Sequence, residues 1–356
     1  MFPRGARVLS VVALAACGAR TELRAPSRDA GALADVPGGT VCTAQDAVLA
    51  ARSAELLLLI DRSSSMAESP SGGAAPPSKW DAVRAVMTDL LPRVDRGLAV
   101  GLELFPGVAM SGICAVDGPP DVLPARGAGA EIVRRLDATG PDGRTPTWGA
   151  LQAAERYFTG HASPGFRAVV LATDGGPNCN SALDGQHCAC AALDHAGQQA
   201  CVDDPALCLD DRRTVDTVRE LAARSIPTFV IGFDASGDAQ LADVLARLAA
   251  AGGRARPGSA HGFYDVRGNG DLQSAVDGIT REVGRCLFAA PPGVGGGAQL
   301  AVFLGSAAIA QDPSHADGWD FADAARGTVA IFGASCERVS ASAEPLRLTV
   351  SCPGGG

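Results

Sequence analysis

The sequence predicts an α/β fold: a doubly wound, mostly parallel sheet flanked by helices, with a cysteine-rich insertion and a small C-terminal β module. Three observations lead to this prediction. Apolar runs alternate with stretches of helical spacing from residue 51 to about residue 289. Two of the runs end in an aspartate. The chain of 356 residues is 47% hydrophobic and 19% charged, a balance that supplies a sizeable core.

The apolar runs predict the strands. Residues 55–61, "ELLLLID", are continuously apolar, as in a parallel strand that is covered on both faces. Residues 98–105 predict the second strand, and residues 121–125 a third at an edge, because Pro124 cannot donate to a ladder. Further strands are predicted at residues 166–175, 226–234 and 262–266.

Amphipathic stretches predict the helices between these strands. In residues 79–91, Trp80, Val83, Met87 and Leu90 form one apolar stripe. Further helices are predicted at residues 128–137, 147–158, 215–222, 241–248 and 272–283. Strands that alternate with helices in this way form a sheet with right-handed crossovers, and sites form at the carboxyl ends of its strands.

The N-terminus is typical of an exported protein. Arg4 and Arg7 precede an apolar stretch at residues 8–16, which predicts a signal peptide over residues 1–16. The Leu-Ala-Ala-Cys sequence that ends at Cys17 resembles the lipobox of bacterial lipoproteins, which implies that Cys17 is acylated. An ordinary secretory signal with a chance cysteine is the alternative. Residues 17–50 are rich in Ala, Gly, Pro, Ser and Asp and predict a flexible tether.

Charge and hydropathy limit the partners. A formal net charge of −9 argues against nucleic acid, whose binding proteins present a basic face. A membrane-spanning helix needs about 20 apolar residues, and no run of that length follows the leader. We therefore expect a lipid anchor rather than a transmembrane helix. Gly18 follows Cys17 where inner-membrane lipoproteins commonly have aspartate, which favours the outer membrane of a bacterial envelope, facing the periplasm or the outside.

Oxygen-bearing side chains gather at the predicted carboxyl edge. Asp61, Ser63 and Ser65 follow the first strand, Thr145 precedes a helix, and Asp174 follows the fourth strand. Such a ligand set suits a hard divalent cation. Two carboxylates and three neutral hydroxyls leave the ion one open position, which an anionic oxygen from outside would fill.

The pattern Asp-x-Ser-x-Ser, a later Thr and then Asp-Gly resembles a von Willebrand factor type A domain with its metal-ion-dependent adhesion site, over about residues 51–287. The resemblance implies that Ser63, Ser65 and Thr145 ligate through hydroxyls, and that Asp61 and Asp174 hold the ion or its waters. It implies Mg²⁺, or Mn²⁺ or Ca²⁺, as the cofactor. The partner is then a protein or polysaccharide that offers a carboxylate, without catalysis.

Arg144 departs from this family, which commonly has a small residue before the threonine, and it puts a long cation beside the site. Other interpretations stay open. The serines are also typical turn and helix caps. A serine nucleophile with a histidine base is disfavoured because no Gly-x-Ser-x-Gly elbow is present. A scaffold with a structural or lost metal, and a hydrolase that uses the ion to activate water, are the alternative functions.

The cysteines agree with export. If Cys17 of the eleven carries lipid, an even set remains, which predicts disulfides in an oxidising compartment. These ten are Cys42, Cys114, Cys179, Cys188, Cys190, Cys201, Cys208, Cys286, Cys336 and Cys352. We expect three bridges among Cys114 and the five cysteines of the insertion at residues 175–211. We further expect Cys42 with Cys286, as in some members of the family, and Cys336 with Cys352.

The insertion begins directly after Asp174, at the edge that carries the predicted ligands. We therefore predict that it forms a rigid rim that selects what reaches the ion. Two metal alternatives exist for it. Zinc would use His187, Cys188, Cys190 and His195, and calcium would use Asp194, Asp203, Asp204, Asp210 and Asp211. Beyond a Pro- and Gly-rich hinge, residues 290–356 predict the small β module, with short strand-like runs and no helical stripe.

Overall fold

The computed structural model describes residues 45–51, 53–70, 77–95, 97–108, 112–116, 118–161, 165–191, 197–256, 258–290, 299–323 and 328–351. The predicted signal peptide, Cys17 and the tether up to residue 44 lie outside these ranges. In the described part of the chain, no helix has the length and apolar character needed to cross a membrane.

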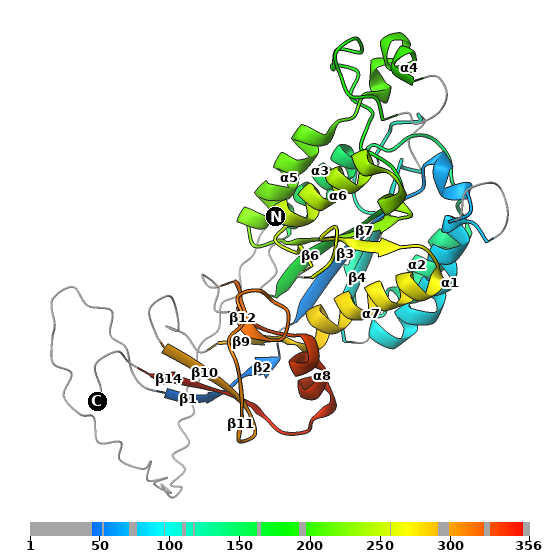
Figure 1. Ribbon diagram of the computed structural model, residues 1–356. Helices are drawn as coiled ribbons and strands as arrows, with labels where there is room; N and C mark the ends of the chain where they lie inside the picture. Colours follow the sequence, from blue (N-terminus) through cyan, green and yellow to red (C-terminus); the bar gives the residue numbers. More distant parts are fainter. Residues whose placement is uncertain are drawn as a thin grey trace, which may run out of the picture. The chain divides into compact units, whose positions relative to one another are not determined.

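The central sheet confirms the predicted fold class. It has six strands in the order β5–β4–β3–β6–β7–β8 (Figure 1). The strands are β3 Ala54–Asp61, β4 Ala99–Phe105, β5 Val122–Ala125, β6 Phe166–Thr173, β7 Thr228–Phe233 and β8 Tyr264–Val266. All neighbours pair in parallel except β5, which pairs antiparallel with β4 at the edge. A Cβ on Gly101 of β4 would lie 2.6 Å from the Pro124 ring, so the edge strand needs a glycine there.

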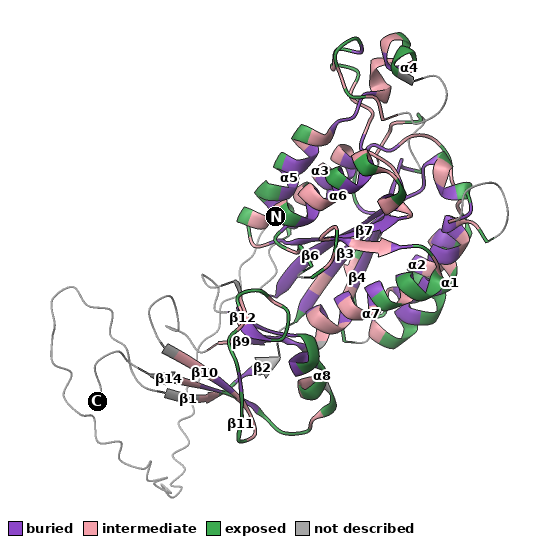
Figure 2. Cartoon of the chain, viewed as in Figure 1, coloured by how far each residue is buried: buried purple, intermediate pink, exposed green. Residues whose placement is uncertain are grey.

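Helices cover both faces of the sheet, with the buried residues between them (Figures 1 and 2). One face is covered by α1 Lys79–Val94, α2 Gly129–Asp137 and α7 Asn269–Arg285, and the other by α3 Thr147–Gly160, α5 Asp211–Ala223 and α6 Ala239–Ala251. Leu56 and Leu58 point into the first core, whereas Leu57 and Leu59 point into the second. This arrangement explains why the β3 sequence is apolar at every position rather than at alternate ones.

The strand order places a topological switch point between β3 and β6. The chain winds outward from β3 through β4 to β5, and then outward from β6 through β7 to β8. Connections leave the carboxyl ends of β3 and β6 in opposite directions, which opens a crevice between them. Asp61 ends β3 and Asp174 follows β6, so the fold brings both aspartates to this crevice.

Residues 45–51 form strands of the C-terminal module, whereas the sequence predicted a tether up to residue 50 and the start of the α/β domain at residue 51. β1 Gln45–Val48 pairs with β14, and β2 Ala50–Ala51 pairs with β9. Leu49 between them is buried in the module core. The segment becomes ordered because it fills two open sheet edges, and a run of seven residues is too short to show this by periodicity.

The module consists of two four-stranded sheets in the orders β1–β14–β10–β11 and β12–β13–β9–β2. Its other elements are β9 Leu287–Ala289, β10 Gln299–Leu304, β11 Ala307–Ile309, β12 Gly318–Asp323, β13 Thr328–Phe332, α8 Gly333–Ala341 and β14 Leu346–Ser351. Trp319 is the largest side chain in its core. The helix α8 was not predicted, and β9 starts before the predicted boundary at residue 290.

The predicted pairings of Cys286 and Cys336 are wrong, because these two cysteines bond to each other. Cys286 directly precedes β9, and Cys336 lies in the first turn of α8, which follows β13. Since β9 and β13 are neighbours and Ile331 N–H donates to the Cys286 carbonyl, the two thiols meet at one end of this ladder. The proposed partners Cys42 and Cys352 lie outside the described residues.

Candidate metal centre

Asp61 is held by two hydrogen bonds at the end of β3. The Ser63 N–H donates to its Oδ1 over 2.7 Å, and the Thr173 hydroxyl donates to its Oδ2 over 2.5 Å. The side chain is fully buried. Thr173 is the last residue of β6, so the partner strand fixes the orientation of this carboxylate. The sequence analysis did not single out Thr173, whose only signal is its position beside Asp174.

The two serines join Asp61 to Asp174. After Ser63 the chain enters a 3₁₀ turn, η1 Ser64–Ala67, which turns both hydroxyls toward the crevice. The Ser63 and Ser65 Oγ atoms lie 3.1 Å apart, and the Ser65 hydroxyl donates to Asp174 Oδ1 over 2.8 Å. The structure therefore brings these four predicted side chains together. Their role as metal ligands stays a prediction.

Thr145 approaches from a third loop, just before α3. Its side chain is buried, and a Cβ added to Gly175 would lie 3.1 Å from its Oγ1. The Thr145 hydroxyl therefore lies against the residue that follows Asp174. The Asn178 side chain accepts from the Thr145 N–H, and the Asn178 N–H donates to the Thr145 carbonyl, both over 2.9 Å. Asn178 is thus a supporting residue that the sequence analysis missed.

Arg62 connects the loops of the site through hydrogen bonds. Its Nε donates to the Gly140 carbonyl over 2.9 Å, and its Nη1 donates to the Pro106 carbonyl over 3.0 Å. The Asp142 N–H donates to the Arg62 carbonyl over 2.6 Å. The loop that carries Thr145 is therefore fixed to the loop that carries Ser63. In the sequence Arg62 occupies a variable position of the motif, so nothing marked it as structural.

Lys79 brings a cation into the site. It is the only lysine of the chain, and it is the first residue of α1, which starts with a capping box between Ser78 and Asp81. Its Nζ lies 2.8 Å from Asp174 Oδ2 and 3.7 Å from Glu68 Oε2. The side chains of Lys79 and Asp174 are both buried, 9% and 0% exposed. The sequence analysis missed Lys79, because only the fold brings the start of α1 to the end of β6.

The electrostatics of the site favour a positive charge. Burial and the nearby charge of Asp174 raise the pKa of Asp61 to about 7, although the hydrogen bonds from Thr173 and Ser63 act in the opposite direction. Asp61 and Asp174 carry two negative charges when both are ionised, and the Lys79 ammonium that contacts Asp174 balances one of them. Because burial disfavours the ionised form of Asp61, a cation bound nearby would stabilise that form.

The donor set fits Mg²⁺ or a similar ion. Mg²⁺ takes oxygen ligands at about 2.0–2.1 Å, so neighbouring ligand oxygens of its octahedron lie about 3 Å apart. The separations Ser63 Oγ to Ser65 Oγ and Ser65 Oγ to Asp174 Oδ1 are 3.1 and 2.8 Å. Lys79 is a rival for the same position, since its ammonium contacts Asp174. The residues therefore fit such an ion, but a bound ion would have to compete with a cation of the chain itself.

The side chain of Arg144, the departure from the family pattern, is neutralised by the insertion. Its Nη2 lies 2.6 Å from Asp204 Oδ2, and this contact lowers the pKa of Asp204. Arg144 N–H donates to the Ile113 carbonyl over 2.8 Å. The residue therefore links the Thr145 loop to the insertion.

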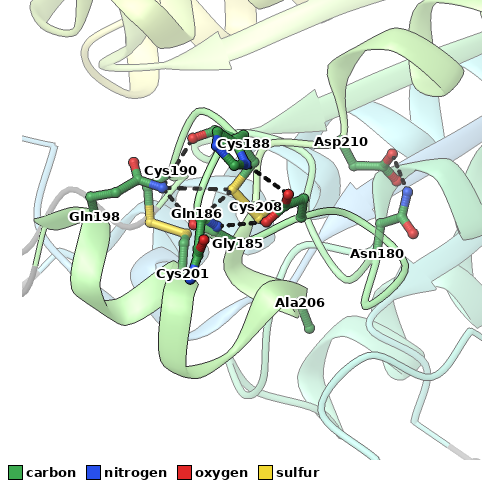
Figure 3. The surroundings of a disulfide bond; sticks show 12 residues. Asn180, Gly185, Gln186, Cys188, Cys190, Gln198, Cys201, Ala206, Cys208 and Asp210 are labelled. Atoms are coloured by element: carbon green, nitrogen blue, oxygen red, sulfur yellow. Dashed lines mark hydrogen bonds and ion pairs between the residues drawn. A yellow bond between two sulfur atoms is a disulfide. The ribbon is translucent and has the colours of Figure 1, made fainter.

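The insertion contains the three predicted bridges. Cys114 bonds to Cys179. Figure 3 shows the other two bridges, which join Cys188 to Cys208 and Cys190 to Cys201. The sulfur atoms of Cys188, Cys201 and Cys208 lie within 4.8 Å of one another. They cluster because two disulfides are adjacent, and a disulfide supplies no thiolate for zinc. The disulfide interpretation is confirmed.

The acidic residues of the calcium alternative already have protein partners. Asp203 accepts from Gln199, Asp204 from Arg144, Asp210 from Asn180, and Asp211 from Arg247. Figure 3 shows the contact between Asn180 and Asp210. Asp194 and His195 lie outside the described residues. These carboxylates stabilise the insertion and its junction with α5 rather than pointing at one common point.

Four of the five histidines are described, and each has contacts away from the serines. His161 contacts Tyr157, His187 contacts Asp184, His261 stacks on Phe263, and His315 contacts Asp320. Within the described part of the chain, the Ser–His arrangement thus has no geometric support.

The chain matches no protein-family model and no curated protein sequence. Solved structures with a similar fold include a point mutant of the PilB minor pilin of Streptococcus sanguinis, with a TM-score of 0.47 and 14% identity. That match covers 65% of this chain and 61% of the pilin chain.

Two further structures are similar. The vWF domain of the type V pili tip protein Mfa5 of Porphyromonas gingivalis has a TM-score of 0.42 and 15% identity, covering 65% of this chain and 95% of that one. Manganese-loaded TRAP protein of Plasmodium vivax has the same two values, covering 66% and 76%. The strand order and the covering helices define the fold of this chain independently of these similarities.

Proposed function

We propose that the protein is a cell-envelope lipoprotein that binds a protein or polysaccharide ligand through a divalent cation. The observation that supports this most is the convergence of Asp61, Ser63, Ser65, Thr145 and Asp174 from three loops at the switch point between β3 and β6. Binding at such a crevice is common for open α/β sheets.

Each side chain has a defined part in this proposal. Ser63, Ser65 and Thr145 offer neutral hydroxyl oxygens, and Asp61 and Asp174 offer the negative charge. A bound Mg²⁺, Mn²⁺ or Ca²⁺ supplies an electrophilic centre that attracts an outside carboxylate. Thr173 and Asn178 orient the ligands, because they hold the Asp61 carboxylate and the Thr145 backbone.

A cavity beside Thr145 supports an acidic ligand. It has a volume of about 370 Å³, and Trp148, Arg156 and Asn178 are among its lining residues. The Arg213 guanidinium lies 3.6 Å from the centre of the Trp148 ring, and its Nε donates to the Asp210 carboxylate, so the charge of Arg213 is already paired. A ligand whose carboxylate completes the ion coordination would find the positive charge of Arg156 in this cavity.

Location in the envelope rests on the leader and on the disulfides. The signal peptide and Cys17 are sequence predictions, and we keep them as part of the proposal. Four disulfides lie among the described residues, which is typical of a chain that matures in an oxidising compartment.

One observation favours a second candidate, a scaffold that docks into an envelope assembly without a bound metal. Lys79 already neutralises Asp174, so the site has an internal cation. In that case ligand binding would not depend on added divalent ions.

An affinity capture with the lipid-free chain tests the two candidates. Envelope extract is passed over the immobilised protein in Mg²⁺ or in EDTA, and Asp61→Asn and Ser65→Ala are compared with Asp216→Asn. Asp216 is an exposed residue of α5, so the last variant controls for loss of a carboxylate. Capture that needs Mg²⁺ and is lost in the first two variants supports the proposal. Capture that survives EDTA and both substitutions supports the scaffold.

A further inference from the structure

A second cavity lies away from the metal centre, between the α/β sheet and the C-terminal module. It has a volume of about 450 Å³. The lining includes Arg254 and Arg256 from the segment after α6, Tyr264 at the start of β8, Arg281 and Glu282 of α7, and His315 of the module. The lining also contains Phe332 and Cys336 of the module, whose strand β2 precedes β3, whereas Asp61 ends β3.

Arg254 is buried with incomplete hydrogen bonding. Its side chain is 7% exposed, and its Nε is buried without an acceptor in the described part of the chain. Its Nη1 lies 3.8 Å from Glu282 Oε1, beyond hydrogen-bond distance. The rings of Phe166 and Phe229 lie 5.8 and 5.5 Å from its guanidinium carbon. A buried donor without an acceptor costs free energy. An anionic oxygen of a ligand would satisfy the Arg254 guanidinium and remove this cost.

Arg256 provides a second, accessible cation. Its guanidinium carbon lies 4.3 Å from the centre of the Tyr264 ring, and its backbone N–H donates to the Gly262 carbonyl over 2.8 Å. The stacking on Tyr264 and the closed loop fix the position of this side chain. Burial raises the pKa of Tyr264 to about 12, so its hydroxyl stays protonated at neutral pH and can donate to a ligand.

The lining carries more positive than negative charge. Arg281 is paired with Glu337 on the rim over 2.9 Å, and His315 is paired with Asp320 over 3.1 Å. Glu282 is then the lining carboxylate closest to Arg254, at 3.8 Å. Burial raises the pKa of Glu282, although the charges of Arg254 and His315 act in the opposite direction. This excess is notable in a chain whose net charge is −9.

We propose that this cavity is a separate binding site for a small organic acid, whose carboxylate or phosphate group contacts Arg254 and Arg256. Guanidinium groups bind both kinds of oxyanion in bidentate fashion, and the volume lies in the usual range for small-molecule sites. The rings of Tyr264, which Arg256 covers, and Phe332, which stacks on His315, add aromatic surface to the lining. The site is independent of the metal centre and of the function proposed for it.

Isothermal titration calorimetry on the full chain tests the proposal in EDTA, at low salt. The probes are glucuronate, glucose 6-phosphate and inorganic phosphate, with glucose as the neutral control. We expect at least one acidic probe to bind and glucose to show no heat. A carboxylate or a phosphate preference identifies the ligand class. Absence of binding by all three acidic probes, or equal binding of glucose, overturns the proposal.

Two arginine variants and two controls locate the site. Arg256→Gln should weaken binding about tenfold without a change in melting temperature, because it removes one charged hydrogen-bonding partner from an exposed position. Arg254→Gln should abolish binding, but it also disturbs packing. Arg219→Gln on α5 and Asp61→Asn should bind the probe like the unaltered chain. Unaltered affinity in Arg256→Gln would refute the assignment, even if Arg254→Gln fails to fold.

Discussion

At the scale of single residues, Lys79 decides how strongly the candidate centre attracts a metal. An ammonium is a compact point charge, and here it contacts the Asp174 oxygen that does not accept from Ser65. A divalent ion at the centre would be repelled by this charge or would displace it. The chain thus carries a cation that would compete with an ion bound at the candidate centre.

Removing this charge should strengthen metal binding. We expect Lys79→Met to bind Mn²⁺ at least about tenfold more tightly, because a buried positive charge close to the ion is lost. Electron paramagnetic resonance of free Mn²⁺ gives the affinity, and Arg84→Met, an exposed cation of α1, is the matched control. Equal affinities for Lys79→Met and the unaltered chain would show that the ammonium does not oppose the metal.

Because Lys79 is the only lysine, its amine also reports on the site. An acylating reagent should label Lys79 slowly in EDTA, where Asp174 holds it, and faster in Mn²⁺. Mass spectrometry of the peptide that contains residue 79 measures both rates. If the labelling rate of Lys79 does not change with Mn²⁺, although the chain binds the ion, the ion pair between Lys79 and Asp174 persists in the metal-bound state.

Asp61 predicts how stability depends on pH without metal. Its folded-state pKa of about 7 exceeds the value of about 3.9 for an unfolded aspartate, so the folded chain binds more protons between these pH values. The free energy of unfolding should therefore fall as the pH rises from 4 to 7 in EDTA. Urea unfolding measures this slope, which Asp61→Asn should reduce. A slope that is as steep in the variant would assign the effect to other groups.

At the scale of elements, the insertion contacts the loop that carries Thr145 directly. The Cys114–Cys179 bridge lies next to Asn178, which holds the Thr145 backbone, and Arg144 contacts Asp204. The bridges Cys188–Cys208 and Cys190–Cys201 join residues within the insertion itself. One bridge therefore supports the site, and the other two shape the predicted rim.

The bridges should have separable effects. Replacing Cys114 and Cys179 by serine should weaken Mn²⁺ binding several-fold, because Asn178 and Thr145 lose their anchor. Replacing Cys188 and Cys208 should leave Mn²⁺ affinity unchanged and alter only ligand capture. By loop-closure entropy the first bridge contributes about 4 kcal/mol and the second about 3 kcal/mol, so stability alone does not separate them. Equal metal affinity in both double variants would contradict this assignment.

At the scale of the whole described chain, the module and the candidate centre lie at opposite ends of β3. β2 of the module precedes β3 by two residues, whereas Asp61 ends the strand. Eight residues of strand span about 25 Å, so the module does not reach the predicted metal ligands. The Cys286–Cys336 bridge and the β2–β9 pairing fix the module to the end of α7 and the start of β3.

Loss of the Cys286–Cys336 bridge should therefore lower stability without changing metal binding. We expect serine at both positions to cost about 2–5 kcal/mol in the free energy of unfolding, as measured by urea titration. The Mn²⁺ affinity should equal that of the unaltered chain. A large drop in affinity in the folded variant would mean that the module supports the site through α7.

The sequence predicted the elements better than the contacts between them. The continuous apolar run of β3 and the stripe of α1 are local signals, and both elements formed where expected. The predicted ligands follow local signals too, because each comes directly after a strand or before a helix. Lys79 and Asn178 gave no such signal, since their partners Asp174 and Thr145 are distant in sequence and only tertiary contact joins them.

The module shows the same limit. Its short strands were visible, but residues 45–51 and α8 were not, because these segments gain order from sheet edges and from a core supplied by other parts of the chain. Cysteine pairing was likewise predicted only where the cysteines are grouped in the sequence or at one edge. The three bridges of the insertion join cysteines grouped at one edge, whereas Cys286 finds Cys336 only through the β9–β13 ladder.

The sequence by itself determined the fold class, the order of its strands and helices, and the oxygen-bearing residues at the carboxyl edge. These depend on hydrophobic periodicity and on which residue types end a strand, and both can be read locally. Only the tertiary structure decided which cation already contacts Asp174, which disulfide supports Thr145, and where the arginine-lined cavity lies. Those features depend on distances between residues far apart in the chain, and such distances are set by packing rather than by any local pattern.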